Sequence, residues 1–159
     1  MTKQKAYEAV FETADSFEPV YEGENKDLES FLDENGYGMQ NIDEVMLAKG
    51  TEGEAIGYAF TITTAEGYGG DIQVTVGITA DGTVSGVSFL SISETAGLGM
   101  KATEASFYEQ YVGVQTDQFY VSKDGGEGEP IDALSGATIT TRAVTGAVNA
   151  ALAYFQNAF

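Results

Sequence analysis

Apolar and polar residues alternate most regularly between residues 71 and 92. The first half of this stretch places four apolar residues at every second position, on one face of an extended chain: Ile72, Val74, Val76 and Ile78. Residues 84–92 are again rich in apolar residues, and Asp81-Gly82 stands between the two segments. Because glycine readily takes the positive φ that tight hairpin turns need, this spacing predicts an antiparallel β-hairpin.

Four further segments combine β-branched and aromatic residues in the way that is typical of strands. They cover residues 17–21, 42–48, 55–64 and 118–121. Residues 49–53 read Lys-Gly-Thr-Glu-Gly, so we expect the strands on either side of them to form another hairpin. The charged stretch from 22 to 40 predicts a loop or a short helix around three apolar residues, Leu28, Phe31 and Leu32.

The strongest helical pattern lies near the carboxyl end, over residues 140–156. Apolar residues recur there at steps of three or four, the period of one buried helix face: Val144, Val148, Leu152, Phe155 and Phe159. Alanines beside this face allow a sheet to approach closely: Ala143, Ala147 and Ala151. Weaker patterns predict short helices over residues 2–14 and 104–111.

These elements predict a single α+β domain of 159 residues, with antiparallel sheet packed against helices and a long helix closing the chain. We expect residues 1–40 to form an N-terminal helix and extension and residues 41–159 to form the core. No internal repeat or low-complexity linker divides the chain.

The composition excludes several kinds of partner and several kinds of reactive or metal-binding site. Seven basic and 25 acidic residues give a net charge of −18, so we expect no nucleic acid partner, because phosphate backbones repel such a surface. The chain has no Cys and no His, which excludes thiol nucleophiles, disulfides, Fe–S clusters, haem ligation by His and nearly every zinc site. We predict no metal site and no catalytic acid or base.

No apolar run reaches 18 residues, so we expect no membrane span, and the polar N-terminus is no signal peptide.

The segment from Asp132 to Arg142 carries the first candidate site. Four hydroxyls crowd the predicted helix start, Ser135, Thr138, Thr140 and Thr141. Backbone N–H groups there lack intrahelical partners and the helix dipole is positive, so a phosphate is favoured. On local chemistry alone, plain helix capping beside a turn at Gly136 explains the same residues equally well.

The segment Glu94-Thr95-Ala96-Gly97-Leu98-Gly99 is the second candidate. Its glycines let the backbone lie close against a flat ligand, and Leu98 offers an apolar face for a ring. An ordinary loop between a strand and a helix, with Leu98 as a core residue, is the alternative interpretation.

Asp132-x-x-Ser135-Gly136-Ala137-Thr138, followed by a Thr-rich helix start, resembles the flavinylation motif of the FMN-binding domain family. This family includes the G subunit of the Rnf electron-transport complex and the C subunit of the sodium-pumping NADH:quinone oxidoreductase. The second segment resembles the family's Glu-Thr-Pro-Gly-Leu-Gly, with Ala96 in place of Pro. The resemblance covers residues 45–159, and the two motifs occur in the family's order.

The resemblance implies a covalent cofactor, FMN, joined to Thr138 by a phosphoester bond. It further implies cofactor contacts from the two motifs, namely Asp132, Ser135, Gly136, Ala137, Thr140, Thr141, Glu94, Thr95, Gly97, Leu98 and Gly99. Lys101 is a candidate partner for the phosphate or the flavin ring, although a nearby carboxylate is the default partner. A separate flavin transferase, acting from FAD with Mg²⁺, would make the bond.

The function implied is that of an electron carrier, the soluble part of a membrane ion-translocating oxidoreductase complex, most like the G subunit of the Rnf complex. We expect an electron-transfer protein on the extracytoplasmic face of the cell membrane, with the other subunits of the complex as partners. Members of these complexes usually carry an N-terminal transmembrane helix, so we expect a fragment from which that anchor has been removed. Two alternatives stay open, an FMN domain of a free-standing extracellular reductase and a non-redox module that binds a phosphate ligand or a protein.

Overall fold

The computed structural model describes residues 3–11, 13–22, 26–34, 37–65, 70–92, 105–116, 118–133 and 137–158. Its centre is a five-stranded antiparallel sheet in which the strands follow one another in chain order. The strands are β1 (Ser16–Glu22), β2 (Gln40–Lys49), β3 (Ala55–Thr64), β4 (Ile72–Thr79) and β5 (Val84–Ser91). Both predicted hairpins are confirmed, since β2 pairs with β3 and β4 pairs with β5.

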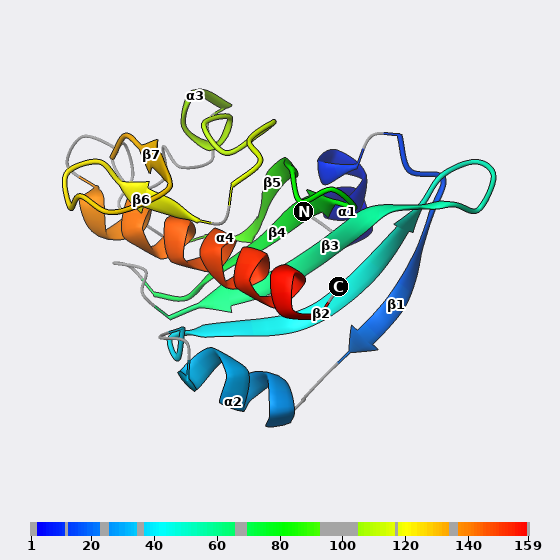
Figure 1. Ribbon diagram of the computed structural model, residues 1–159, viewed down its shortest axis with the longest axis horizontal. Coiled ribbons are helices and arrows are strands. Elements are labelled where there is room, and N and C mark those ends of the chain that lie inside the picture. Colours follow the sequence, from blue (N-terminus) through cyan, green and yellow to red (C-terminus); the bar gives the residue numbers. More distant parts are fainter. Residues whose placement is uncertain are drawn as a thin grey trace.

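Helices lie on both faces of this sheet (Figure 1). The long helix α4 (Thr138–Ala158) crosses one face, and α1 (Lys3–Val10) packs on the other, against β4 and β5. The helix α2 (Lys26–Glu34) connects β1 to β2, and the single-turn α3 (Ala105–Tyr108) follows β5 in the chain. The predicted α+β class is therefore confirmed. No helix in the described ranges is long and apolar enough to cross a membrane.

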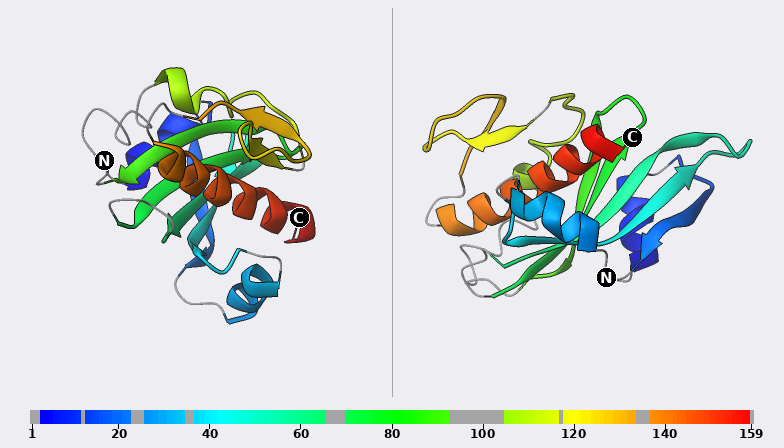
Figure 2. Two further views of the ribbon diagram at one scale, coloured as in Figure 1. Left: turned by 90° about the vertical axis from the view of Figure 1, so that its left-hand side faces the viewer. Right: turned by 60° about the horizontal axis from the view of Figure 1, so that its bottom comes forward.

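A small parallel pair of strands lies beside the beginning of α4 (Figures 1 and 2). It joins β6 (Phe119–Val121) to β7 (Glu129–Ile131). The strand β7 was not predicted from the sequence. A three-residue strand that contains Pro130 has no recognisable period, and its pairing depends on β6 rather than on its own sequence.

The main core lies between α4 and the sheet. The predicted face of α4 is buried, with Val144, Val148 and Leu152 fully inaccessible to solvent. Ala143, Ala147 and Ala151 are buried with them, as the approach of a helix to a sheet requires. Phe155 is only partly buried against this core, and Phe159 lies outside the described residues. The helix begins at Thr138, two residues before the predicted start.

A second, smaller core forms under α1, and it includes two small residues of the sheet, Ala48 and Ala59. Gly77 and Gly86 face each other across β4 and β5, and both lie against Val10. A methyl group at Gly77 would meet Cβ of Val10 at 2.9 Å, and one at Gly86 would meet its Cα at 3.0 Å. These glycines therefore set the distance between α1 and the sheet. Both faces of β4 are buried, although the period-2 pattern of its sequence indicated only one.

The side chain of Tyr111 ties the segment after α3 to α4. Its buried hydroxyl hydrogen-bonds Thr145 at 2.8 Å, and its ring packs edge-on against Phe107 and Phe119. One turn further along α4, the Asn149 amide accepts from the N–H of Phe119 and donates to its carbonyl, both at 2.8 Å. The helix thus holds β6 in place.

We predict that Gly77→Ala lowers the free energy of unfolding by about 1–3 kcal/mol, because the new methyl group has no room beside Val10. Urea unfolding followed by circular dichroism measures the loss. Gly50→Ala is the control, since its methyl group would meet only the end of the Glu54 side chain. Equal stability of the two variants would contradict the packing of α1 described above.

Burial raises the pKa of the Tyr111 hydroxyl well above its usual range. The unfolded chain ionises first, so the contribution of Tyr111 to stability is fully present below about pH 10 and is lost as the pH rises further. Stability should therefore fall less steeply above about pH 10 in Tyr111→Phe than in the parent. At neutral pH the variant should be less stable by about 1 kcal/mol, the value of one hydrogen bond. Urea unfolding of both proteins at neutral pH and above about pH 10 tests this. An equal loss of the free energy of unfolding in parent and variant between the two conditions would contradict it.

Candidate functional site

The beginning of α4 separates the three threonines that the sequence grouped together. Thr138 is the first helical residue and its side chain is partly exposed, whereas Thr140 and Thr141 are 1% and 0% exposed. The Thr141 hydroxyl donates to the carbonyl of Ala137 at 3.0 Å, and the Thr141 N–H donates to the same oxygen at 3.1 Å. Of these three hydroxyls, only that of Thr138 is accessible for chemistry.

Lys123 lies beside this hydroxyl. Its Nζ donates to Oγ1 of Thr138 at 3.3 Å, from the loop that connects β6 to β7. Sequence reasoning missed this lysine, although it is one of only seven basic residues in the chain. An ammonium group next to an accessible hydroxyl makes a suitable place for an anion bound to that oxygen.

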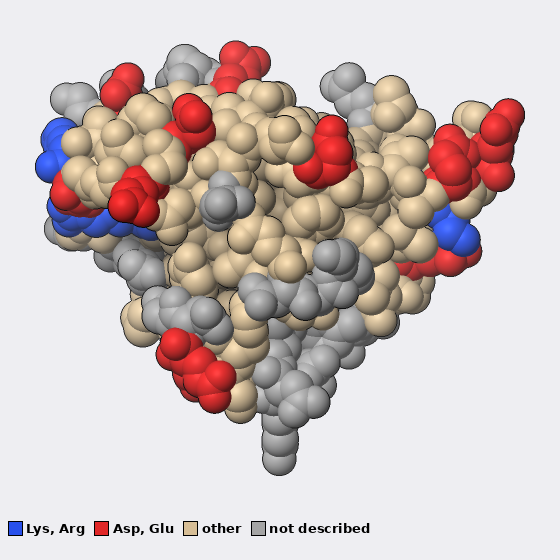
Figure 3. Space-filling view, in the orientation of Figure 1, with Lys and Arg blue, Asp and Glu red and all other residues tan. Residues whose placement is uncertain are grey.

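An ion pair fastens the Lys123 loop to α4. Arg142 donates from Nε and Nη2 to the two carboxylate oxygens of Asp124, at 2.8 and 2.5 Å. This guanidinium holds the pKa of the Asp124 carboxyl below its usual range. Figure 3 shows the resulting concentration of basic atoms over the left-hand end of the molecule, on a face that is otherwise dotted with acidic groups.

Asp132 lies between β7 and the helix start, and its side chain is exposed. Its backbone is held on both sides by Gln110, whose Oε1 accepts from the Asp132 N–H at 2.8 Å and whose Nε2 donates to the Asp132 carbonyl at 3.2 Å. The carboxylate accepts from the Ser122 hydroxyl at 3.3 Å. Asp132 therefore contacts the residue that precedes Lys123 in the chain, but no contact joins it to Lys123 or Thr138 among the described residues.

Several predicted contacts lie outside the described residues. They are Ser135 and Gly136 in the first motif, and Glu94, Thr95, Gly97, Leu98, Gly99 and Lys101 in the second. Ala137 is described and is buried.

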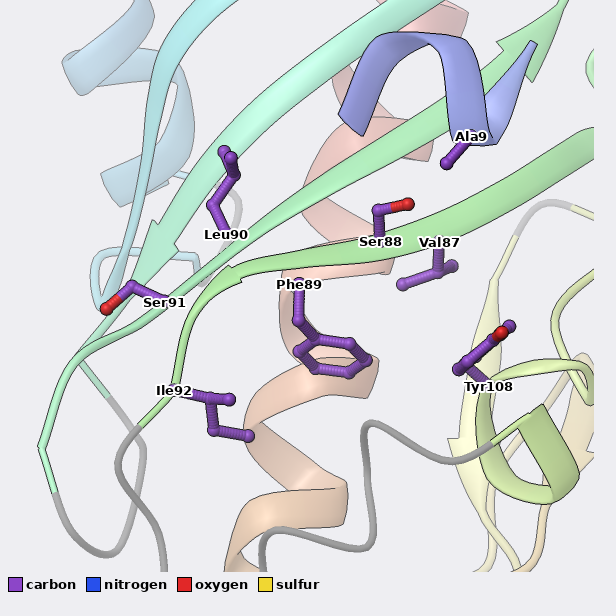
Figure 4. A pocket seen from close by; sticks show the side chains of 8 residues that line it. All are labelled: Ala9, Val87, Ser88, Phe89, Leu90, Ser91, Ile92 and Tyr108. Carbon is purple, nitrogen blue, oxygen red and sulfur yellow. The ribbon is translucent and has the colours of Figure 1, made fainter. Parts of the chain in front are cut away.

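A cleft of about 470 Å³ lies along β5, and its lining includes described residues that precede and follow the second motif in the chain (Figure 4). Ile92, the last described residue before that motif, lines it together with Phe89, and Tyr108 of α3 lies on the other side. The carboxyl end of β5 and the amino end of α4 lie at the same, left-hand end of the molecule in Figure 1. The pattern of the sequence did not identify Phe89 or Tyr108 as candidate site residues, because both read as ordinary core positions.

Comparison with known proteins connects these features. A family model for the FMN-binding domain matches residues 67–153. The G subunit of the Na(+)-translocating ferredoxin:NAD(+) oxidoreductase complex of Acetobacterium woodii is 34% identical over 160 residues, which cover 98% of this chain and 75% of the relative. The G subunit of the proton-translocating ferredoxin:NAD(+) oxidoreductase complex of Clostridium ljungdahlii is 42% identical over 88 residues, 55% of this chain and 48% of the relative.

The fold also has a solved counterpart. The C subunit of the Na(+)-translocating NADH-quinone reductase from Parabacteroides distasonis aligns with a TM-score of 0.61 and 18% identity, over 100% of this chain and 86% of that chain. At this identity the likeness concerns the fold. The family model spans more than half of this chain and the Acetobacterium relative matches nearly all of it, so the chain belongs to the FMN-binding domain family.

Proposed function

We propose that Thr138 carries FMN through a phosphoester bond and that the protein serves as an electron carrier. The observation that carries the proposal is the accessible Thr138 hydroxyl beside the Lys123 ammonium, at the start of α4. The neighbouring Thr140 and Thr141 are buried, which leaves Thr138 as the attachment point among the described hydroxyls of this helix start.

The described residues suit such a group. A hydroxyl oxygen is the atom that a phosphoester requires, and a lysine is a common partner for phosphate. The cleft along β5 has a volume typical of small-molecule sites, and Phe89, Ile92 and Tyr108 offer apolar surface to an aromatic ring beside the polar side chains of Ser88 and Ser91. When bound, FMN would supply the ability to accept and donate electrons. The protein would fix its position and limit its contact with water.

Attachment requires an external catalyst. In the step we propose, Oγ1 of Thr138 forms a bond to the flavin phosphorus of FAD, the phosphoanhydride bond breaks, AMP leaves and the hydroxyl proton is released. Nothing is oxidised or reduced. A hydroxyl needs a base or a metal ion to become a good nucleophile, and the chain has no His or Cys to act as one. A flavin transferase with Mg²⁺ is therefore the proposed partner in maturation.

The relatives support a role in a larger assembly. Their names describe the G subunits of complexes that translocate sodium ions or protons and that link ferredoxin to NAD(+). We propose that this chain is the FMN-carrying G subunit of an Rnf-type complex at the cell membrane, on the extracytoplasmic face. Its redox partners would then be other subunits, and the protein would act within their electron path rather than as a stand-alone catalyst.

Intact mass measures the proposed attachment directly. Co-expression with a flavin transferase should add one FMN residue, about 440 Da for FMN less water, to the peptide that contains Thr138. Thr138→Ala should abolish the addition and Thr138→Ser should retain it. Thr51→Ala, in the exposed turn between β2 and β3, is the matched control and should be modified like the parent. Modification of Thr138→Ala at another residue would refute the assignment, and a parent chain that stays unmodified would favour a non-redox binding module.

The acidic surface should affect the redox potential. With a net charge of −18, the protein disfavours additional negative charge on the flavin, so its reduction potential should lie below that of free FMN. Added salt screens these charges and should raise the potential towards the free value. Spectroelectrochemical titration at low and high ionic strength gives the comparison. A potential that does not change with salt would count against this electrostatic effect.

A further inference from the structure

We propose that Lys123 is the counterion of the phosphodiester on Thr138, an inference that rests on the proposed function. The phosphorus bonds to Oγ1 of Thr138, the atom that Nζ of Lys123 contacts at 3.3 Å. The charged oxygens of the diester are attached to that phosphorus, so they lie within reach of the same flexible ammonium group. A hydrogen bond to an ionised oxygen is stronger than the hydroxyl contact that it would replace.

The local charges leave this lysine available. Arg142 is occupied by Asp124 through two hydrogen bonds, so these two charges cancel. Lys123 forms no salt bridge in the described ranges, where its Nζ contacts the neutral Thr138 hydroxyl. The pKa of the Asp124 carboxyl is lowered first by the hydrogen bond from Arg142, and the charge of Lys123 is only the smallest of the causes that lower it. A phosphodiester adds one negative charge at this point. The ammonium group would neutralise it on a chain whose other charges are mostly negative.

The fold keeps Lys123 over Thr138 from two sides. On one side, the Ser122 N–H donates to the carbonyl of Ile131 at 2.9 Å, which joins the loop to β7. On the other, Asp124 binds Arg142, which follows Thr138 by about one turn of α4. Both sequence neighbours of Lys123, Ser122 and Asp124, are therefore held in place by hydrogen bonds. A lysine placed by chance on a free loop would have neither restraint.

This arrangement gives Lys123 a role in positioning the cofactor. With its phosphate held against the loop, the phosphodiester would keep one orientation instead of rotating about the bonds of the Thr138 side chain. The same contact should make the lysine less reactive towards amine reagents, because its nitrogen is held in a charge-assisted hydrogen bond to the phosphate.

Amine labelling tests the pairing. The chain is prepared with and without a co-expressed flavin transferase, and intact mass first confirms FMN on Thr138. Both forms are treated with limiting acetic anhydride, and peptide mass spectrometry gives the acetylation rate of each lysine. We expect Lys123 to react about threefold more slowly in the flavinylated form at low salt, because a nitrogen held in a charge-assisted hydrogen bond is less available to the reagent. High salt should remove the difference.

Lys49 is the internal control, because it pairs with Glu18 at 2.9 Å in the β1–β2 region and should react equally in both forms. Equal rates at Lys123 in a chain that carries FMN would overturn the counterion assignment alone. A protection that persists unchanged in high salt would also overturn it, because that result indicates steric cover. Absence of FMN from Thr138 would instead overturn the proposed function.

Thermal unfolding of variants separates pairing from folding. Lys123→Gln should lower the Tm of the flavinylated form by about 1 to 3 °C, as expected for one exposed ion pair. It should leave the Tm of the unmodified form unchanged, and Lys123→Arg should restore the parent value. A loss of the same size in both forms would show that the lysine serves the fold and would overturn the proposal.

Discussion

Everything at the candidate site depends on the burial of α4 against the five-stranded sheet. Val144, Val148 and Leu152 are fully buried in this interface, and each such side chain stabilises the fold by about 1.5–3 kcal/mol. The helix cannot slide along the sheet without exposing them. Thr138 begins this helix, Arg142 holds the Lys123 loop to it, and its later turns hold β6. The position of the proposed attachment point is thus fixed by hydrophobic packing.

The same packing explains why one threonine differs from its neighbours. A helix that lies on a sheet buries the side of its first turn that faces the core, and this side includes Thr140 and Thr141. Thr138 lies towards the loop between β6 and β7, where Lys123 supplies the local basic charge and the Arg142–Asp124 pair fastens the loop. Helix capping and cofactor attachment are therefore not exclusive interpretations of the motif. Buried hydroxyls serve the helix, and the accessible one remains for chemistry.

The sequence predicted those parts of the fold that depend on local periodicity. The β4–β5 hairpin follows from alternation around Asp81-Gly82, and α4 follows from a buried face of period 3.6. The packing of α1 on Gly77 and Gly86 did not follow, because a glycine in a strand does not indicate which distant helix will lie on it. The motif of one segment likewise indicated Thr138 as the attachment point, which stays a proposal.

Contacts between segments were harder to predict. The contact between Lys123 and Thr138 joins residues 15 positions apart and exists because β7, a strand without a sequence signal, returns the chain beside β6. The cleft along β5 combines Phe89 with Tyr108, which only the tertiary fold brings together. The central claim of a single ester at Thr138 is tested most directly by ³¹P NMR of the flavinylated protein. A phosphodiester should give one resonance whose position is constant between about pH 5 and 8, whereas a resonance that titrates near pH 6, as a phosphomonoester does, would contradict the claim.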